Sequence, residues 1–276
     1  MPELPEVETT RRHLEPALVG RVIEKAVVTH ARTARRNASP EELVERLQGR
    51  RVLSLRRHGK FLVGELDDGW TLIAHLGMSG RFSLGSPGDA VPPHTHVVLG
   101  LDDGTEVRFT DPRTFGFVAV FDEDEMASSP LARLGPDAWS DGLDAERLAA
   151  ALANRKAPIK ALLLDQGPVA GLGNIYADEI LFQAGIHPMT PGGDITGPRL
   201  EALLEATRGV LAAAIEAGGT TLDDLAYLLP DGRAGENLPS LRVYGRTGEP
   251  CFACGTPIER IVIRARSTHF CPHCQH

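Results

Sequence analysis

Four cysteines near the end of the chain constrain its fold more than any other feature. They form two Cys-X-X-Cys pairs, Cys251 with Cys254 and Cys271 with Cys274, sixteen residues apart, and the chain has no other cysteine. Two such pairs supply four thiolates to one tetrahedral zinc ion, which is the pattern of a structural zinc ribbon. Because protein atoms fill all four positions, the ion has no open site for a substrate. Two disulfides or unligated thiols are the alternatives, and the paired spacing favours one structural zinc.

Length and composition favour a globular protein of about two domains plus the ribbon. The chain has 276 residues, of which 42% are hydrophobic. It has no apolar run near the roughly 20 residues of a membrane-spanning helix, and residues 1–6 lack the basic and apolar regions of a signal peptide. We therefore expect a protein of the reducing cytoplasm with no membrane partner, which also favours zinc over disulfides.

The net charge argues against nucleic acid as a partner, but its distribution does not. The formal charge is −8, from 29 basic and 37 acidic side chains. Basic residues nevertheless cluster between Arg50 and Lys60 and again between Arg242 and Arg266, whereas acidic residues gather elsewhere. A chain that is acidic overall can still present one basic face to DNA.

The hydrophobic pattern changes from strands to helices once along the chain. A helical pattern with Pro5 in its first turn precedes short β-branched runs that turn residues separate. Seven such runs predict an antiparallel sandwich or barrel. They lie at 22–28, 52–55, 61–66, 71–76, 97–101, 107–110 and 117–121. After an acidic stretch at 122–142, one helix is expected to open at Pro158, a second to be capped by Asn174, and a third to cover 198–217.

The N-terminus carries a group capable of covalent catalysis. If Met1 is removed, Pro2 presents a secondary amine, and an α-amino group titrates at about pH 8, so part of it is nucleophilic at neutral pH. Its attack on a sugar C1′ would give an iminium, which is an electron sink for a later elimination. Glu3 could transfer protons, and Glu6 could steady it from the next turn. An ordinary helix start is the alternative, and these residues alone do not decide between the two.

Three further features suit a DNA ligand. A glycine-rich segment at 167–173 leads into a helix whose free N–H groups could bind a phosphate. A cationic hairpin ends at Lys60, where it could hold phosphates beside a lesion. Large side chains in glycine-bounded loops could fill the gap left by an extruded base; they are Met78, Arg113 and Phe115. The alternatives are a tight connector, a solvated strand edge and ordinary core side chains, respectively.

Six short segments, in order along the chain, match one family pattern. They are 1–9 (MPELPEVET), 75–80 (HLGMSG), 110–113 (TDPR), 171–179 (GLGNIYADE), 244–246 (YGR) and 266–275 (RSTHFCPHCQ). Together they resemble the formamidopyrimidine-DNA glycosylase family of bacterial base-excision repair enzymes. Because the segments span essentially the whole chain, the combination is far more specific than any one of them.

The resemblance implies an α+β multidomain fold. Residues 1–130 would form an antiparallel β-sandwich that carries the catalytic N-terminal helix, and 131–142 would be a linker. A helical domain with a helix-two-turn-helix motif would follow over 143–240, and the zinc ribbon would cover 241–276. Double-stranded DNA would lie in the cleft between the two domains.

The resemblance also implies an activity and the residues that perform it. The protein would be a bifunctional DNA glycosylase and AP lyase that excises oxidised purines, such as 8-oxoguanine and formamidopyrimidines, and nicks the strand by β,δ-elimination. Pro2 would be the nucleophile, and Glu3 would handle protons on the sugar. Lys60 would contact phosphate and lesion and serve β-elimination, while Arg266 would grip a phosphate and serve δ-elimination. The further DNA contacts would be His94, Lys156, Lys160, Asn174 and Tyr244, with Met78, Arg113 and Phe115 filling the void.

Two alternatives stay open. The endonuclease VIII branch of the same superfamily prefers oxidised pyrimidines, but it usually has glycine where this chain has Leu4. A non-catalytic zinc-ribbon DNA-binding protein is the second alternative, and the retained Pro2 and Glu3 count against it. Between Tyr227 and Leu241 many family members carry an aromatic residue after a glycine-containing turn, but residues 235–239 (GENLP) have none, which leaves the order of lesion preference open. We expect a monomer in the bacterial cytoplasm, associated with the nucleoid.

Overall fold

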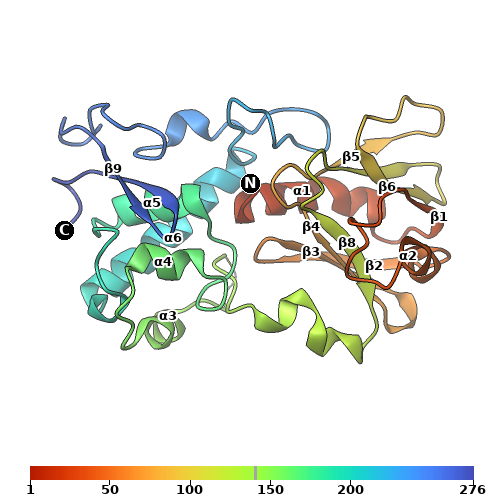
Figure 1. Ribbon diagram of the computed structural model, residues 1–276, viewed down its shortest axis with the longest axis horizontal. Helices are drawn as coiled ribbons and strands as arrows, with labels where there is room; N and C mark the ends of the chain where they lie inside the picture. Colours follow the sequence, from red (N-terminus) through yellow and green to blue (C-terminus); the bar gives the residue numbers. More distant parts are fainter. Residues whose placement is uncertain (140–141) are drawn as a thin grey trace. The chain divides into compact units, whose positions relative to one another are not determined.

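The computed structural model describes residues 1–139 and 142–276, which form two compact units (Figure 1). Unit 1 contains residues 1–132 and 217–238, and unit 2 contains residues 133–216 and 239–276. The segment 217–238 thus packs with the N-terminal unit, whereas we expected it within a helical domain over 143–240. Residues 133–139 of the expected linker belong to unit 2, and residues 140 and 141 lie outside the described residues.

Unit 1 contains two four-stranded antiparallel sheets, which confirms the predicted sandwich (Figure 1). Their strand orders are β1-β6-β7-β5 and β2-β3-β4-β8. The elements are α1 (Leu4–Leu18), β1 (Ile23–Val28), α2 (Pro40–Leu47), β2 (Val52–His58), β3 (Phe61–Leu66), β4 (Thr71–His75), β5 (Arg81–Gly85), β6 (Thr95–Leu101), β7 (Glu106–Thr110) and β8 (Phe117–Phe121). Short 3₁₀ helices lie at η1 (Asp67–Gly69) and η2 (Glu125–Ser128), and η3 (Pro130–Arg133) follows at the end of the first stretch of unit 1.

The core of unit 1 is formed by apolar side chains that alternate along its strands. Strand β8 is buried on both faces, because Phe117 and Phe121 pack outside the sandwich against a second cluster that includes Phe61 and Met126. Strand β5 was not predicted, since it is only five residues long and its two apolar residues, Phe82 and Leu84, are not β-branched. Helix α2 was also missed, although Ser39 caps it by accepting the Glu42 N–H at 3.2 Å.

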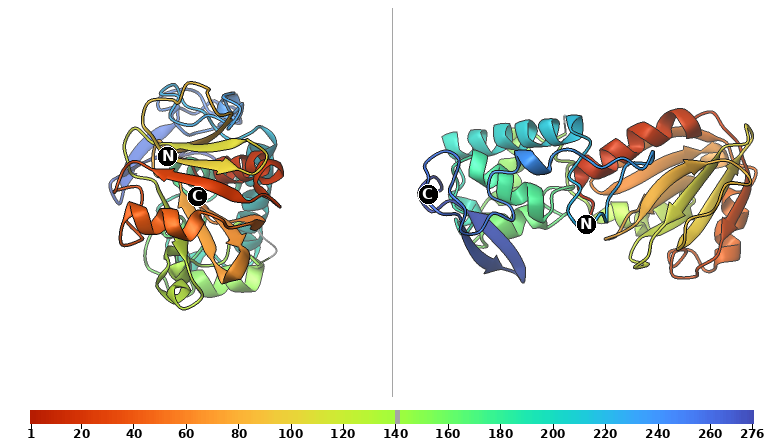
Figure 2. Two further views of the ribbon diagram at one scale, coloured as in Figure 1. Left: turned by 90° about the vertical axis from the view of Figure 1, so that its right-hand side faces the viewer. Right: turned by 90° about the horizontal axis from the view of Figure 1, so that it is seen from above.

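Helix α1 lies along the β2–β3 hairpin (Figure 2). Its apolar face is buried against the sandwich through Leu4, Val7, Leu14 and Leu18. Pro16 lies inside the helix rather than at its end, and the helix stops two residues later. This packing fixes the direction of the N-terminal turn, where the predicted catalytic residues lie.

Unit 2 combines a group of helices with a C-terminal hairpin, which lies against α5 (Figure 1). The elements are α3 (Ala145–Leu152), α4 (Ile159–Leu164), α5 (Asn174–Gln183), η4 (Gly192–Asp194), α6 (Pro198–Glu216), β9 (Glu259–Ile263) and β10 (Arg266–Phe270), and η5 (Leu238–Ser240) precedes the hairpin. Gly173 occupies the N-cap position of α5 in an extended conformation, so the expectation that Asn174 caps this helix is wrong. Within the described residues, no helix is both long and apolar enough to cross a membrane.

Candidate functional site

Three buried residues lie at the start of α1: Pro2 and Glu3 directly before the helix, and Glu6 in its first turn. Pro2, Glu3 and Glu6 are buried, with 2% of each glutamate exposed. The Glu6 carboxylate accepts the backbone N–H of Glu3 at 2.7 Å and that of Thr220 at 2.8 Å. Glu6 therefore fixes the backbone beside Pro2 and ties the segment 217–238 to the start of α1.

The segment 217–238 is braced by hydrogen bonds within itself. The Tyr227 hydroxyl donates to Gly218 O at 3.0 Å, and Thr221 Oγ1 donates to Tyr227 O at 3.0 Å. Burial, followed by the nearby charge of Glu6, raises the pKa of Tyr227, so its hydroxyl remains a donor at neutral pH. At Gly219, which has φ +84°, a Cβ would lie 2.9 Å from Glu6 Oε1. A glycine is therefore required where this segment meets α1.

Lys60 lies at the turn of the β2–β3 hairpin, which a buried ion pair attaches to α1. His58 pairs with Phe61, so Gly59 and Lys60 form the turn, and Lys60 is 6% exposed. Arg57 binds the Glu8 carboxylate at 3.3 Å and also donates to Gly59 O at 3.0 Å. Glu8 thereby links the catalytic helix to the residue directly before Lys60.

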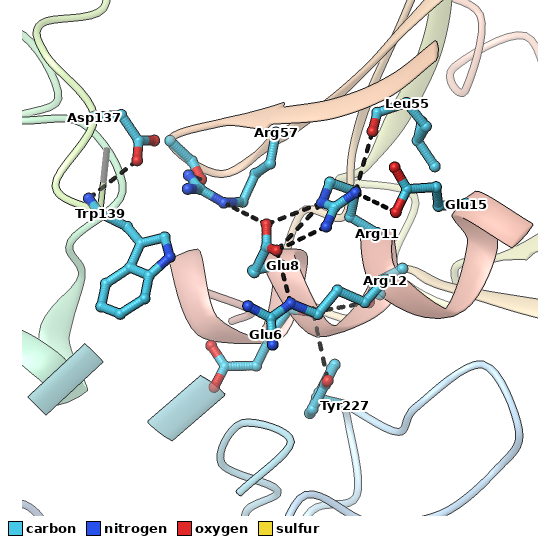
Figure 3. Close-up of polar contacts among 12 residues, drawn as sticks. Glu6, Glu8, Arg11, Arg12, Glu15, Leu55, Arg57, Asp137, Trp139 and Tyr227 are labelled. Atoms are coloured by element: carbon cyan, nitrogen blue, oxygen red, sulfur yellow. Dashed lines mark hydrogen bonds and ion pairs between the residues drawn. The ribbon is translucent and has the colours of Figure 1, made fainter. Parts of the chain in front are cut away.

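Glu8 is the centre of this connection (Figure 3). Its carboxylate binds Arg11 at 3.0 Å, Arg12 at 2.9 Å and Arg57 at 3.3 Å, and only 9% of its side chain is exposed. Burial alone would raise the pKa of Glu8, but the hydrogen bonds from Arg11 and Arg12 outweigh it and the pKa is lowered. Glu8 is therefore ionised at neutral pH, as this arrangement of arginines requires.

We predict that Glu8→Gln lowers the free energy of unfolding at pH 7 by about 2–3 kcal/mol, because buried guanidinium groups lose their counter-charge. The folded-state pKa of Glu8 lies below the unfolded value of about 4.3, so its charge stabilises the fold fully above roughly pH 5. This contribution is lost as the pH falls through the folded-state pKa. Urea denaturation of both proteins between pH 3 and 8 measures this pH-dependent contribution.

Glu15→Gln is the control, since Glu15 also binds Arg11 but is half exposed. This substitution should change the free energy of unfolding by at most about 0.5 kcal/mol. A pH-independent difference between Glu8→Gln and the native protein would contradict the assignment.

His75, which was not among the predicted site residues, lies directly before the loop of Met78. Its Nδ1 accepts the Gly77 N–H at 3.0 Å, and its ring contacts Phe61 at 4.7 Å between centroids. Burial lowers the pKa of His75 to about 4, with a further contribution from the charge of Lys60. The imidazole is therefore uncharged at neutral pH, and it lies close enough to the Lys60 ammonium to interact with it electrostatically. In the sequence, the only indication of a role for His75 was its place in the segment 75–80 (HLGMSG).

The predicted void-filling residues lie on two neighbouring loops of unit 1. Met78 is half-buried, Arg113 is exposed, and 40% of Phe115 is exposed. The Arg113 guanidinium lies 5.0 Å from the centre of the Phe115 ring. His94 is exposed just before β6 with φ +63°, and its carbonyl accepts the Asp111 N–H at 3.0 Å. The side chains of His94, Arg113 and Phe115 are thus open to a ligand, whereas that of Met78 is half-buried.

In unit 2, a buried ion pair occupies one predicted DNA contact. Lys160 is fully buried, and its ammonium binds the Asp178 carboxylate and, at 3.2 Å, the carbonyl of Ser267. Asp178 also accepts the backbone N–H of His269 at 3.0 Å and contacts His269 Nδ1 at 3.1 Å. This geometry does not fit a direct contact of Lys160 with DNA. It joins α4 and α5 to β10, the strand that begins with Arg266.

The neighbouring Glu179 organises a second predicted contact. Its carboxylate accepts the backbone N–H groups of Arg242 at 2.7 Å, Val243 at 2.9 Å and Tyr244 at 2.8 Å. Burial raises the pKa of Glu179 and these three N–H groups oppose the rise. The Tyr244 ring lies edge-on to His269, with centroids 5.2 Å apart. Two adjacent acids of α5 therefore hold Tyr244 and the Arg266 hairpin next to each other.

The other predicted contacts of unit 2 are accessible. Arg266 is exposed and follows a turn in which Arg264 and Ala265 have φ +46° and +60°. Lys156 is exposed before α4. Asn174 is half-buried at the first position of α5, and its Oδ1 has no hydrogen-bond partner among the described residues. This amide thus lies at the N-terminus of α5 with part of its hydrogen-bonding capacity unused.

The four cysteines form a geometry that fits one zinc ion. Their sulfur atoms all lie within 4.8 Å of one another, with 4.0 Å between Cys251 and Cys274 and 3.5 Å between Cys254 and Cys271. Tetrahedral coordination with zinc–sulfur bonds of about 2.3 Å places the sulfurs about 3.8 Å apart. The knuckles are backed by a small apolar cluster with Val243. The predicted zinc site is confirmed, and its closed thiolate set makes the ion structural.

Comparison with family models accounts for most of the chain. Residues 1–118 match the model described as "Formamidopyrimidine-DNA glycosylase N-terminal domain". Residues 134–225 match "Formamidopyrimidine-DNA glycosylase H2TH domain", and residues 248–276 match "Zinc finger found in FPG and IleRS". The three matches follow the order of the sandwich, the helices and the ribbon.

Individual relatives cover the chain from end to end. A protein of Corynebacterium efficiens named formamidopyrimidine-DNA glycosylase is 46% identical over 100% of this chain and 99% of its own length. The crystal structure of the MutM (Fpg) protein of Thermus thermophilus superimposes with a TM-score of 0.88 at 43% identity, covering 99% of this chain and 98% of that one. The Lactococcus lactis Fpg, in complex with DNA that contains an abasic site, gives a TM-score of 0.89 at 34% identity, covering 99% of each chain.

Proposed function

The chain belongs to the formamidopyrimidine-DNA glycosylase family, and we propose that its Pro2 amine, freed by removal of Met1, carries the chemistry. The protein is a DNA glycosylase with AP lyase activity that acts on oxidised purines in duplex DNA. The observation that carries the assignment of residues is the buried pair Pro2 and Glu3, whose backbone Glu6 fixes at 2.7 Å. A surface helix start would need no such buried carboxylates.

In the proposed reaction, the lone pair of the Pro2 nitrogen attacks C1′ of the damaged nucleotide. The bond from C1′ to the base breaks, and the base leaves with the electron pair and takes up a proton. The Pro2 nitrogen loses its proton, Glu3 donates a proton to the ring oxygen, and the bond from C1′ to that oxygen breaks, which leaves an iminium between C1′ and the Pro2 nitrogen. The iminium then acidifies C2′, so that loss of a C2′ proton expels the 3′ phosphate, and a second elimination expels the 5′ phosphate. One covalent intermediate thus serves both activities.

Cationic side chains supply the phosphate contacts in this proposal. Lys60 stands at the β2–β3 turn, where the Glu8–Arg57 ion pair holds it to the catalytic helix, and serves β-elimination. Arg266 begins β10 and serves δ-elimination. Further DNA contacts come from His94, Arg113, Lys156, Asn174 and Tyr244. Lys160 supports these contacts from the protein interior, because its ammonium forms an ion pair with the Asp178 carboxylate. Zinc, when bound by the four thiolates, cross-links the ribbon that presents Arg266.

Borohydride trapping tests the proposed function and its main alternative. The native protein should form a covalent adduct on a duplex with 8-oxoguanine opposite cytosine, and the adduct should form more slowly on a matched duplex with thymine glycol. Faster trapping on thymine glycol would assign the chain to pyrimidine lesions. Tight binding without any adduct on either duplex would leave only a DNA-binding role.

We also propose that the protein works as a monomer in the bacterial cytoplasm, associated with the nucleoid. Its DNA substrate, its bacterial relatives and a thiolate zinc site, which requires reduced cysteines, support this location. Zinc-replete protein purified under reducing conditions should therefore be the active form.

A further inference from the structure

One buried carboxylate bridges the two loops that carry Met78, Arg113 and Phe115. Asp111 follows β7 and is 0% exposed. Its Oδ1 accepts the hydroxyl of Ser79 at 2.6 Å and the backbone N–H of Arg113 at 3.3 Å, and its Oδ2 accepts the N–H of Gly116 at 2.7 Å. Asp111 thus bonds to the loop of Met78 and to both ends of the segment that bears Arg113 and Phe115.

The two loops lie together because of the register of both sheets. Loop 76–80 leads from β4 to β5, and loop 111–116 leads from β7 to β8. His75 of β4 pairs with Phe117 of β8, and Arg81 of β5 pairs with Thr110 of β7, so both loops cross between the sheets at the same place. They touch through their backbones: at Gly77, with φ +64°, a Cβ would lie 2.3 Å from Gly116 N.

Arg35 also holds the loop 111–116, through the carbonyl groups of the loop. Arg35 donates to Phe115 O at 2.8 Å and to Gly116 O at 2.6 Å. The guanidinium of Arg32, from the same turn, lies 5.4 Å from the centre of the Phe115 ring, and that of Arg113 lies 5.0 Å from it. The N–H groups of the segment therefore face Asp111, its carbonyls face Arg35, and the aromatic ring stays 40% exposed.

We infer that Asp111 is a positioning residue for base extrusion: it preassembles Met78, Arg113 and Phe115 into one rigid wedge before DNA binds. The inference rests on the proposed function, in which these three side chains fill the gap left by the lesion. A loop that is already ordered loses little conformational entropy on insertion, so more of its contact energy offsets the unstacking of the base. Asp111 itself touches neither sugar nor base in this scheme.

Asp111→Asn separates extrusion from the later chemistry. Asparagine has nearly the same volume as aspartate. Its NH₂ group, however, would face one of the three donors that now bind the carboxylate, and two donors cannot form a hydrogen bond with each other. Single-turnover excision of 8-oxoguanine opposite cytosine should fall roughly tenfold, since one buried hydrogen bond is lost and one donor opposes another. Strand cleavage at a preformed abasic site, which has no base to unpair, should stay within about twofold of the native rate.

Asp103→Asn is the matched control, because Asp103 also accepts a backbone N–H, from Thr105 at 2.9 Å, but in an exposed turn away from both loops. It should leave both rates unchanged. If melting curves show that Asp111→Asn is unfolded, Ser79→Ala takes its place, since it keeps the Asp111 carboxylate but removes the 2.6 Å bond from the Met78 loop and the 3.2 Å bond that Ser79 Oγ accepts from the Arg113 N–H. A several-fold loss of excision with unchanged abasic-site cleavage is expected for it.

The outcomes distinguish the wedge from the proposed function. A folded Asp111→Asn protein with native rates on both substrates would overturn the positioning role while the glycosylase and lyase activities stood. An equal loss on both substrates would also overturn it, because Asp111 would then support the fold in general. A native protein that processes neither substrate would instead refute the proposed function. Selective loss of excision, in Asp111→Asn or in Ser79→Ala, is the result that the wedge requires.

Discussion

Blocking the Pro2 amine should abolish borohydride trapping and lower base excision by about a thousandfold or more, the scale on which enzymes lose activity without their nucleophile. An N-terminal extension that prevents removal of Met1 leaves Pro2 as an amide, whose nitrogen lone pair is delocalised. Pro2→Gly retains a primary amine on a more mobile backbone, so its trapping should also fall sharply. Rapid-quench assays on the 8-oxoguanine duplex measure both variants.

Pro16→Ala is the control for this experiment, because Pro16 lies in the same helix but more than three turns from Pro2. It should trap DNA as the native protein does. The blocked protein should still bind the lesion duplex, since the cations that we propose as phosphate contacts are unchanged. A blocked protein that still cross-links would assign the nucleophile to another amine, with Lys60 as the first candidate.

Loss of zinc should weaken DNA binding by about a hundredfold, or about 2.8 kcal/mol, before the sandwich unfolds. Zinc binding supplies roughly 10 kcal/mol of folding free energy to ribbons of this kind. Cys271 directly follows β10, whose first residue is Arg266, so Cys271→Ser should release the strand that presents this arginine. Unit 1 has its own core and includes neither the ribbon nor any of the four thiolates.

Fluorescence anisotropy on the lesion duplex, together with zinc content and thermal unfolding, measures this effect. His273→Ala is the matched control, since His273 is exposed in the same knuckle and is not needed as a ligand. It should keep zinc and full affinity. Full DNA affinity in zinc-free Cys271→Ser protein would show that the ribbon does not hold Arg266 against phosphate. Loss of the sandwich transition in the same protein would show that zinc stabilises the whole chain.

Much of the fold was predictable because its signals are local. Hydrophobic alternation located strands such as β3 and β6, and the paired cysteines defined the zinc site. Strand β5 escaped because it is only five residues long and has no β-branched residue, and its place is set by pairing with β7. The segment 217–238 was expected in the helical domain, but Glu6 and Tyr227 bind it to unit 1 across more than two hundred residues of sequence.

The predicted site residues were found through the segments in which they lie, and their supports were not. Glu179 binds the backbone of Tyr244 from 65 positions away, and Asp178 binds His269 from 91 positions away. Neither acid is distinguishable from a solvated helix residue in the sequence, because the partner groups are backbone N–H groups that every residue has. Lys160 was predicted as a DNA contact from its sequence segment, but its side chain is fully buried, which the sequence did not indicate.

Residue type and short spacing were enough to identify the zinc ligands and to propose the Pro2 amine as nucleophile. How the proposed reactive groups are held is visible only in the folded chain. Asp111 meets Ser79 only because the registers of two sheets place two crossover loops side by side. Long-range pairing of this kind is selected by the packing of the whole sandwich, in which a slip of one residue would turn every side chain to the opposite face.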